Sequence, residues 1–181
     1  MTAVHPSVTN CGLGDPDGHF LVYIDKRPNF SGLTLAKQVQ ALSSGEIYAI
    51  GQACGNGWRK VFNLYAKLIF ALADAQFPVA RHSKTWQQYR EQSLLQSGSN
   101  TALLFSIPSS MQEQSLGKVH IVMGRSYAKS LTLPLSLIWL DNEFAIDRAA
   151  RLIVCPYFDY RQLSNIKLIR LVTLIREILS P

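Results

Sequence analysis

The chain has 181 residues, of which 48% are hydrophobic and 17% are charged. This length corresponds to one ordinary domain, and the composition excludes disordered, collagen-like and coiled-coil proteins. Lysine and arginine number 18 against 12 aspartates and glutamates, so the formal net charge is +6. A surplus of this kind favours a polyanionic partner such as nucleic acid, and it is equally compatible with a role in solubility alone.

The N-terminal residues 1–18 are polar and rich in turns, and we expect them to form an arm that precedes a single domain of residues 19–181. They lack the apolar centre of a signal peptide. No apolar run approaches the roughly 20 residues that a membrane span requires. The three cysteines have no CxxC spacing and indicate reduced thiols. The sequence therefore predicts a cytoplasmic protein without a membrane partner, and it does not define an oligomeric state.

Four short, apolar segments alternate with segments of helical periodicity. We expect strands at residues 19–25, 101–107, 118–123 and 152–155. We expect helices at residues 33–42, 84–95 and 125–129 and after Ser164. Apolar residues also recur at helical spacing from Ile47 to Leu72, and the glycines there leave two alternatives: one weakened helix, or a break at residues 55–57 with the firm helix starting at Trp58. Strands of this kind, joined by helical crossovers, are typical of a parallel sheet that is covered on both faces. The predicted fold is α/β, a three-layer α/β/α sandwich around a four-stranded parallel sheet.

The carboxyl ends of parallel strands meet at one edge of the sheet, which is where ligands bind in such folds. Four loops should converge there, at residues 25–32, 106–111, 124–127 and 156–164. The chain has no P-loop, no GxSxG elbow and no HExxH motif, and we expect neither a metal nor a cofactor. His120 lies inside an expected strand and Cys155 ends another, so we interpret both as packed core residues.

Residues suited to binding a nucleotide fall on or near these loops. Asp25 ends the first strand, where its carboxylate could activate a water; the alternative is a turn aspartate paired with Lys26 or Arg27. A nucleotide site could use Asn56 and the Trp58 indole, and the alternative places Trp58 in the core. The other candidates for binding a base or a phosphate are Phe30, Ser106, Arg125, Tyr157, Phe158, Asp159 and Arg161.

The order of these segments resembles the uracil-DNA glycosylase superfamily, and especially its mismatch-specific and thymine-DNA glycosylase branch. FLVYID followed by Pro28 is similar to the family's strand that ends in Gly-Ile-Asn-Pro, and GNGWRK looks like its Gly-Asn-Arg-Phe-Trp-Lys stretch. VHIVMGRSYA resembles its third strand, glycine and small-residue helix, and LIVCP with the later Leu163-Ser164 resembles its final strand and DNA-entering loop.

The resemblance implies a fold that flips a base into a pocket at the strand ends, without a metal or cofactor. It implies that Asp25 holds the catalytic water and that Leu163 enters the DNA. Phe30 or Phe158 would stack on the base, and Asn56 would read its edge. Phosphate contacts would come from Lys26, Arg27, Arg125 and Arg161.

Three functions remain open from the sequence. The first is a divergent DNA glycosylase-like enzyme that binds nucleic acid or a nucleobase and hydrolyses an N-glycosidic bond. The second is an inactive member of the fold that binds nucleic acid, a nucleotide or a protein. The third is an interaction domain that uses the aromatic loop at residues 157–160 as an interface.

Overall fold

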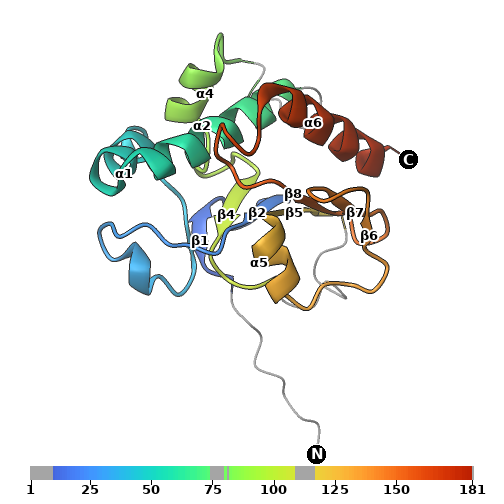
Figure 1. Cartoon of the computed structure of the whole chain (residues 1–181). Coiled ribbons are helices and arrows are strands. Elements are labelled where there is room, and N and C mark those ends of the chain that lie inside the picture. Colours follow the sequence, from blue (N-terminus) through green and yellow to red (C-terminus); the bar gives the residue numbers. More distant parts are fainter. Residues whose placement is uncertain (1–9, 74–79, 81, 109–116, 181) are drawn as a thin grey trace, which may run out of the picture.

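The computed structural model describes residues 10–73, 80, 82–108 and 117–180. Its centre is an eight-stranded mixed sheet with the strand order β3-β1-β4-β2-β5-β8-β7-β6 (Figure 1). The strands are β1 (Gly12–Gly14), β2 (Phe20–Tyr23), β3 (Val39–Gln40), β4 (Thr101–Leu104), β5 (Val119–Met123), β6 (Ile138–Trp139), β7 (Ala145–Asp147) and β8 (Leu152–Cys155).

The α/β class is as predicted, but the extent of the sheet is not. The four predicted strands are β2, β4, β5 and β8, which lie side by side and run parallel. The prediction of a four-stranded parallel sheet is wrong because each flank adds two short strands. β1 pairs antiparallel with β4 and β3 parallel with β1, while β7 pairs antiparallel with β8 and β6 antiparallel with β7.

The structure also corrects the expected N-terminal arm, since residues 12–14 form β1 within the sheet. A Cβ atom at Gly12 would lie 2.2 Å from the carbonyl oxygen of Leu103, and one at Gly14 would lie 2.4 Å from that of Thr101. The close approach of β1 to β4 thus requires glycine, a residue that disfavours strands when it is considered alone. Residues 1–9 of the expected arm lie outside the described residues.

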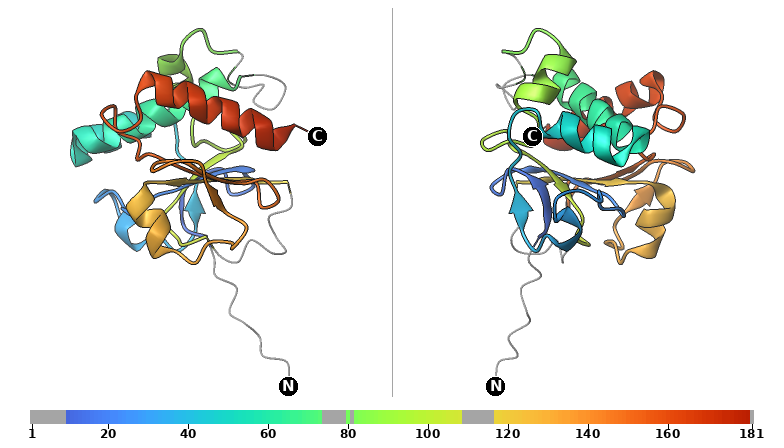
Figure 2. Two further views of the ribbon diagram at one scale, coloured as in Figure 1. Left: turned by 45° about the vertical axis from the view of Figure 1, so that its right-hand side comes forward. Right: turned by 90° about the vertical axis from the view of Figure 1, so that its left-hand side faces the viewer.

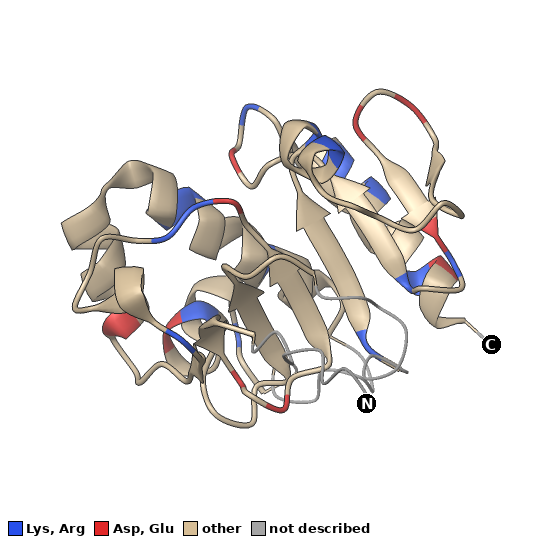
Figure 3. Ribbon diagram, turned by 90° about the horizontal axis from the view of Figure 1, so that it is seen from below, with Lys and Arg blue, Asp and Glu red and all other residues tan. Residues whose placement is uncertain are grey.

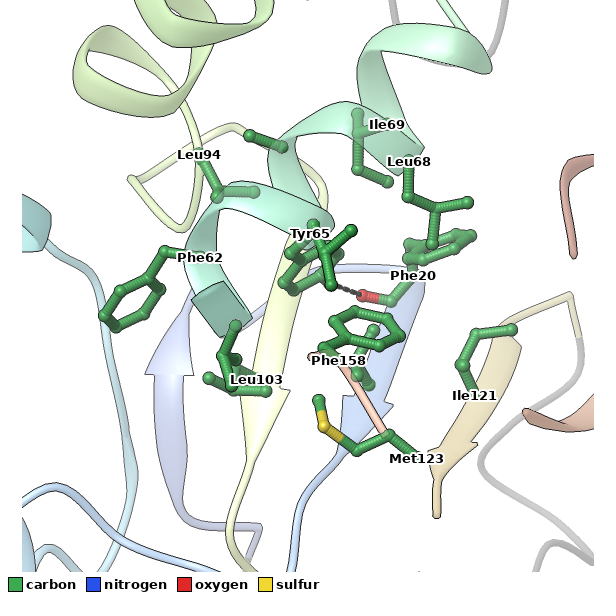
Figure 4. Close-up of a cluster of buried hydrophobic side chains, with 14 of the residues drawn as sticks. Phe20, Phe62, Tyr65, Leu68, Ile69, Leu94, Leu103, Ile121, Met123 and Phe158 are labelled. Atoms are coloured by element: carbon green, nitrogen blue, oxygen red, sulfur yellow. Dashed lines mark hydrogen bonds between the residues drawn. The ribbon is translucent and has the colours of Figure 1, made fainter. Parts of the chain in front are cut away.

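Long helices cover one face of the sheet, as Figure 2 shows. The helices on this face are α1 (Glu46–Cys54), α2 (Asn56–Ala71), α4 (Trp86–Gln92) and α6 (Asn165–Leu179). The apolar stripe of α2 packs Phe62, Tyr65 and Leu68 onto the sheet, where they meet Phe20 and Ile121 (Figure 4). Gly55, with φ of 91°, separates α1 from α2, so of the two alternatives the structure has the break, and α2 begins two residues before Trp58.

The opposite face carries a thinner layer. Only the short helix α5 (Arg125–Ser130) and the 3-10 helix η1 (Leu33–Leu35) contribute helical structure there, within the described part of the chain. The predicted helix at residues 33–42 is therefore wrong beyond Leu35, because the segment continues into β3. A smaller apolar cluster lies beneath the sheet on this face, around Leu21, Val122 and Val154.

The two core assignments made from the sequence are confirmed. His120 is 3% exposed and Cys155 is fully buried, and burial raises the pKa of the Cys155 thiol. None of the helices in the described residues is long and apolar enough to span a membrane.

Candidate functional site at the strand ends

The carboxyl ends of the four parallel strands form one edge of the molecule. Tyr23 of β2 is in register with Leu104 of β4 and with Val122 of β5, and Met123 of β5 is in register with Cys155 of β8. The turns that begin at Asp25, Ser106, Gly124 and Pro156 therefore open at the same edge, as predicted. Figure 3 shows charged residues in these loops and in α5, near the ends of the parallel arrows.

Asp25 lies exposed at this edge, close to two tyrosines. Burial raises the pKa of both Tyr127 and Tyr157, and the negative charge of Asp25 raises each further. A Cβ atom at Gly124 would lie 3.9 Å from the Tyr157 ring and 4.0 Å from Tyr127, so the glycine sits between these two side chains. The Lys26 ammonium lies 5.4 Å from the centroid of the Tyr157 ring. One carboxylate, one cation and two half-buried phenols thus share the centre of the edge.

Trp139 extends this edge, and the sequence analysis did not identify it. Trp139 is in register with Ala145 of β7, which in turn faces Val154 of β8. The cations of Arg125 and Lys129, on α5, lie 5.9 and 5.8 Å from the centroid of its ring. The sequence signal that could have pointed to it is a single tryptophan in a leucine-rich segment, residues 131–140, that has no other aromatic residue.

We define the strand-end surface as the side chains of Asp25, Lys26, Arg125, Tyr127, Lys129, Trp139 and Tyr157. It combines aromatic rings that are partly accessible with cations at cation–π distance from two of them. It carries three cations against one carboxylate. In the described residues, no group of three histidine, cysteine or acidic side chains is placed to hold a metal ion.

Arg27 is engaged in holding its own loop. Its guanidinium donates to the carbonyl oxygens of Thr34 and Ala36, each at 3.2 Å, and to the Cys11 sulfur at 3.1 Å. It also lies 5.7 Å from the centroid of the Phe105 ring. Arg27 therefore fastens the segment that follows Asp25 onto the sheet, which is a different role from the predicted phosphate contact. Phe30, in the same segment, is half-buried against the main core.

The side chains at the start of α2 contribute more to the packing of the core than to a binding surface. Asn56 is exposed at the first residue of the helix. The Trp58 indole is half-buried, with its ring centroid 6.0 Å from that of Phe62 and 6.4 Å from that of Phe105. These contacts favour the alternative in which Trp58 belongs to the core. Ser106 is also tied into the fold, because its hydroxyl accepts a hydrogen bond from the Cys11 amide at 3.3 Å.

The loop after β8 is anchored to α2 through Asp159. Its carboxylate pairs with the Lys60 ammonium at 2.8 Å and accepts a hydrogen bond from the Arg161 amide at 2.9 Å. These bonds hold the pKa of Asp159 below its usual value. The side chain of Asp159 thus has a structural partner, while Arg161 is exposed beside it.

Two predicted contact residues in this loop are corrected by their burial. Phe158 and Leu163 are each 0% exposed. The Phe158 ring packs edge-on against Tyr65, with the centroids 6.2 Å apart, and points into the core (Figure 4). A buried Phe158 cannot stack on a base, and a buried Leu163 cannot enter a DNA duplex. Both side chains lie in the core because the loop folds back against α2 before α6 begins.

The described residues define an α/β protein with a basic and aromatic edge at its strand ends. A family model described as a family of unknown function, DUF6942, matches residues 11–176, so the chain belongs to this family. A search of curated proteins and a search of solved structures each found no match.

Proposed function

We propose that this DUF6942 protein binds nucleic acid through the strand-end surface. The observation that carries the proposal is the pairing of cations with accessible rings: Lys26 with Tyr157, and Arg125 and Lys129 with Trp139. Bases stack on aromatic side chains, and phosphates bind to neighbouring cations, in proteins that hold single strands.

The geometry supports a single strand better than a duplex. Two aromatic groups at different points of one edge can stack on unpaired bases, whereas the bases of a duplex already stack on each other. The long side chains of Lys26, Arg125 and Lys129 can exchange the face of a ring for a phosphate without a change in the backbone. The overall charge of +6 adds a long-range attraction for the polyanion.

The test is titration of a fluorescent single-stranded oligonucleotide, with the matched duplex beside it. Trp139→Ala should weaken binding of the single strand by about 1–3 kcal/mol, the usual contribution of one stacked base. Arg125→Ala combined with Lys129→Ala should reduce the slope of log K against log salt by about 2, since each lost phosphate contact removes about one unit.

Lys84→Ala is the matched control, because Lys84 is exposed in the segment before α4 and lies outside the strand-end surface. It should change the affinity for the oligonucleotide far less than the double variant does. Equal losses for Lys84→Ala and for the strand-end variants would show a diffuse attraction instead of a site. If oligonucleotides do not bind and the chain dimerises through residues 157–160, the interaction-domain hypothesis replaces this one.

A second candidate function is hydrolysis of an N-glycosidic bond by Asp25. The observation that favours it is an exposed carboxylate at the carboxyl end of β2, where the resemblance to the uracil-DNA glycosylase superfamily expects the residue that positions water. Within the described residues, Asp25 forms no ion pair with a lysine or arginine. Such a carboxylate could stabilise a sugar that acquires cationic character as the base leaves. Stacking would then fall to Phe30 or Tyr157, since Phe158 is buried.

Asp25→Asn separates this second candidate from binding alone. The substitution keeps the shape of the side chain, so the affinity for oligonucleotides should be retained. Excision from uracil-containing and mispaired DNA should be abolished if Asp25 positions the water. Absence of excision by the unmodified protein on all of these substrates would leave the binding function and remove the enzymatic one.

A further inference from the structure

A second candidate site lies among the helices, away from the strand-end surface. Residues of helices α1, α2 and α4 line a pocket of about 140 Å³ that is partly open to solvent. Ile47 and Phe62 line it but are only 5% and 1% exposed, so Tyr48, which is 61% exposed, supplies most of its accessible apolar surface. Polar side chains, among them Gln52 and Arg59, lie around them. None of the residues that line this cavity belongs to the strand-end surface.

A glycine in the middle of α1 makes room for one of these polar side chains. A Cβ atom at Gly51 would lie 2.6 Å from Cγ of Arg59, which is closer than real Cβ atoms approach. Glycine inside a helix costs about 1 kcal/mol relative to alanine, so its presence calls for a reason in the packing. The stem of Arg59 crosses α1 at this point, and Gly51 thereby sets where the guanidinium lies relative to the cavity.

The charges in the cavity leave the Arg59 guanidinium available. Arg90, which also lines the cavity, pairs with the Glu91 carboxylate at 2.7 Å and donates to the side-chain oxygen of Asn63. Arg90 and Glu91 therefore neutralise each other. Arg59 has no hydrogen bond or ion pair from its side chain to any described residue, and it gives the cavity a net positive charge.

The volume of the pocket indicates how large the apolar part of a ligand can be. A closed cavity of about 150 Å³ takes up benzene, so an open pocket of about 140 Å³ has room for a ring of that size. We propose that this pocket binds a small organic anion, with a benzene-sized group against Tyr48 and its carboxylate or phosphate on Arg59. Carboxylates and phosphates suit this assignment because the planar guanidinium can donate two parallel hydrogen bonds to either group.

The experiment follows backbone amide signals by NMR while benzoate, phenyl phosphate or benzyl alcohol is added. Benzoate or phenyl phosphate should give saturable shifts at amides of α1, α2 and α4, and the better of the two shows which oxyanion the site prefers. Neutral benzyl alcohol should bind at least about tenfold more weakly, since it lacks the charge that pairs with Arg59. Equal binding of benzyl alcohol, or no saturable shift with either anion, would overturn the proposal.

Two variants test whether Arg59 holds the anion. Arg59→Gln should weaken binding of the anionic probe by about 10- to 100-fold, the range for loss of a charged hydrogen bond. Arg148→Gln is the matched control, because Arg148 is another exposed arginine that does not line the cavity, and it should leave the affinity unchanged. An equal loss in both variants would reduce the effect to overall charge and overturn the proposal.

Gly51→Ala gives a second, independent variant that removes no polar group. The added methyl group should displace the Arg59 stem and weaken binding of the anionic probe several-fold, while alanine favours the helix and the fold is retained. The proposal fails if Gly51→Ala and Arg59→Gln both bind benzoate and phenyl phosphate as the unmodified protein does.

Discussion

The two faces of the sheet are built in different ways. On the face covered by α1, α2, α4 and α6, the core is large and mostly apolar, and it includes aromatic side chains such as Phe62, Tyr65 and Phe158. On the face that carries α5 and η1, the apolar cluster is smaller. Polar groups lie buried beside that smaller cluster: the Tyr23 hydroxyl is 2.9 Å from Nδ1 of His120, and Asp147 is 3% exposed.

This difference teaches how each face is stabilised. The helical face buries apolar surface, so its stability depends on volume and packing. The thin face covers its strands with a short helix and loops, so it depends more on specific hydrogen bonds between buried polar groups. The three predictions below test this contrast, one on the helical face and two on the thin face.

The largest effect is expected on the helical face. Phe158→Ala should lower the free energy of unfolding by about 3–5 kcal/mol, because it leaves a cavity against Tyr65. Chemical denaturation measures this change. Ile166→Ala on α6 is the control, since Ile166 is 80% exposed and its truncation should stay within about 0.5 kcal/mol. A small effect of Phe158→Ala would mean that this face does not depend on close packing.

A pH-dependent loss of stability is expected on the thin face. Burial, with a smaller contribution from Lys118, lowers the pKa of His120 to about 4 from a normal value of 6.5. The folded state therefore favours the neutral ring, and its contribution to stability is complete above pH 6.5 and is lost between 6.5 and 4. The free energy of unfolding should fall by about 2 kcal/mol between about pH 7 and pH 5 on this account.

His120→Asn checks whether this ring is the cause. The asparagine side-chain amide can take the place of Nδ1 in the hydrogen bond with the Tyr23 hydroxyl, yet it does not titrate in this range. Denaturation of the variant should show most of the slope between pH 7 and pH 5 removed. An unchanged slope would show that other titratable groups cause the pH dependence. The burial of His120 beside Tyr23 would then not contribute to it.

The smallest effect is expected from one hydrogen bond on the thin face. The Ser136 hydroxyl donates to the buried carboxylate of Asp147, which also accepts from the Ala150 amide at 3.0 Å. Ser136→Ala should cost about 1 kcal/mol, because the carboxylate keeps its backbone partner. Ser130→Ala, at the exposed end of α5, should cost less in the same denaturation assay. Equal costs would show that burial of the acceptor adds nothing.

Part of the strand-end site could be predicted from the sequence. Asp25, Gly124 and Pro156 each end an apolar strand, and the rule that parallel strands share a carboxyl edge places their turns together. The roles of the individual side chains at that edge could not be predicted from the sequence. Arg27 and Lys26 are adjacent in the sequence, yet Arg27 is bonded to Thr34 and Ala36 while Lys26 lies beside Tyr157.

The burial of the aromatic residues in the loop after β8 could not be predicted from the sequence either. Tyr157, Phe158 and Tyr160 look alike as a run of aromatic residues, but they are half-buried, fully buried and 41% exposed, respectively. Their burial depends on how the loop turns onto α2, where Lys60 holds Asp159. The contact of Arg59 with Gly51 was hidden for a related reason, since it depends on the angle between α1 and α2.

The sequence by itself determined the four parallel strands, which are short apolar runs bounded by turn residues, and the main helices, which are marked by a helical period of apolar residues. The tertiary structure decided the flanking strands β1, β3, β6 and β7, which are too short to carry such a period and form by pairing with neighbours distant in the chain. It also decided which cations and rings are accessible at the strand ends. Accessibility depends on packing between segments, and no local pattern of residues encodes it.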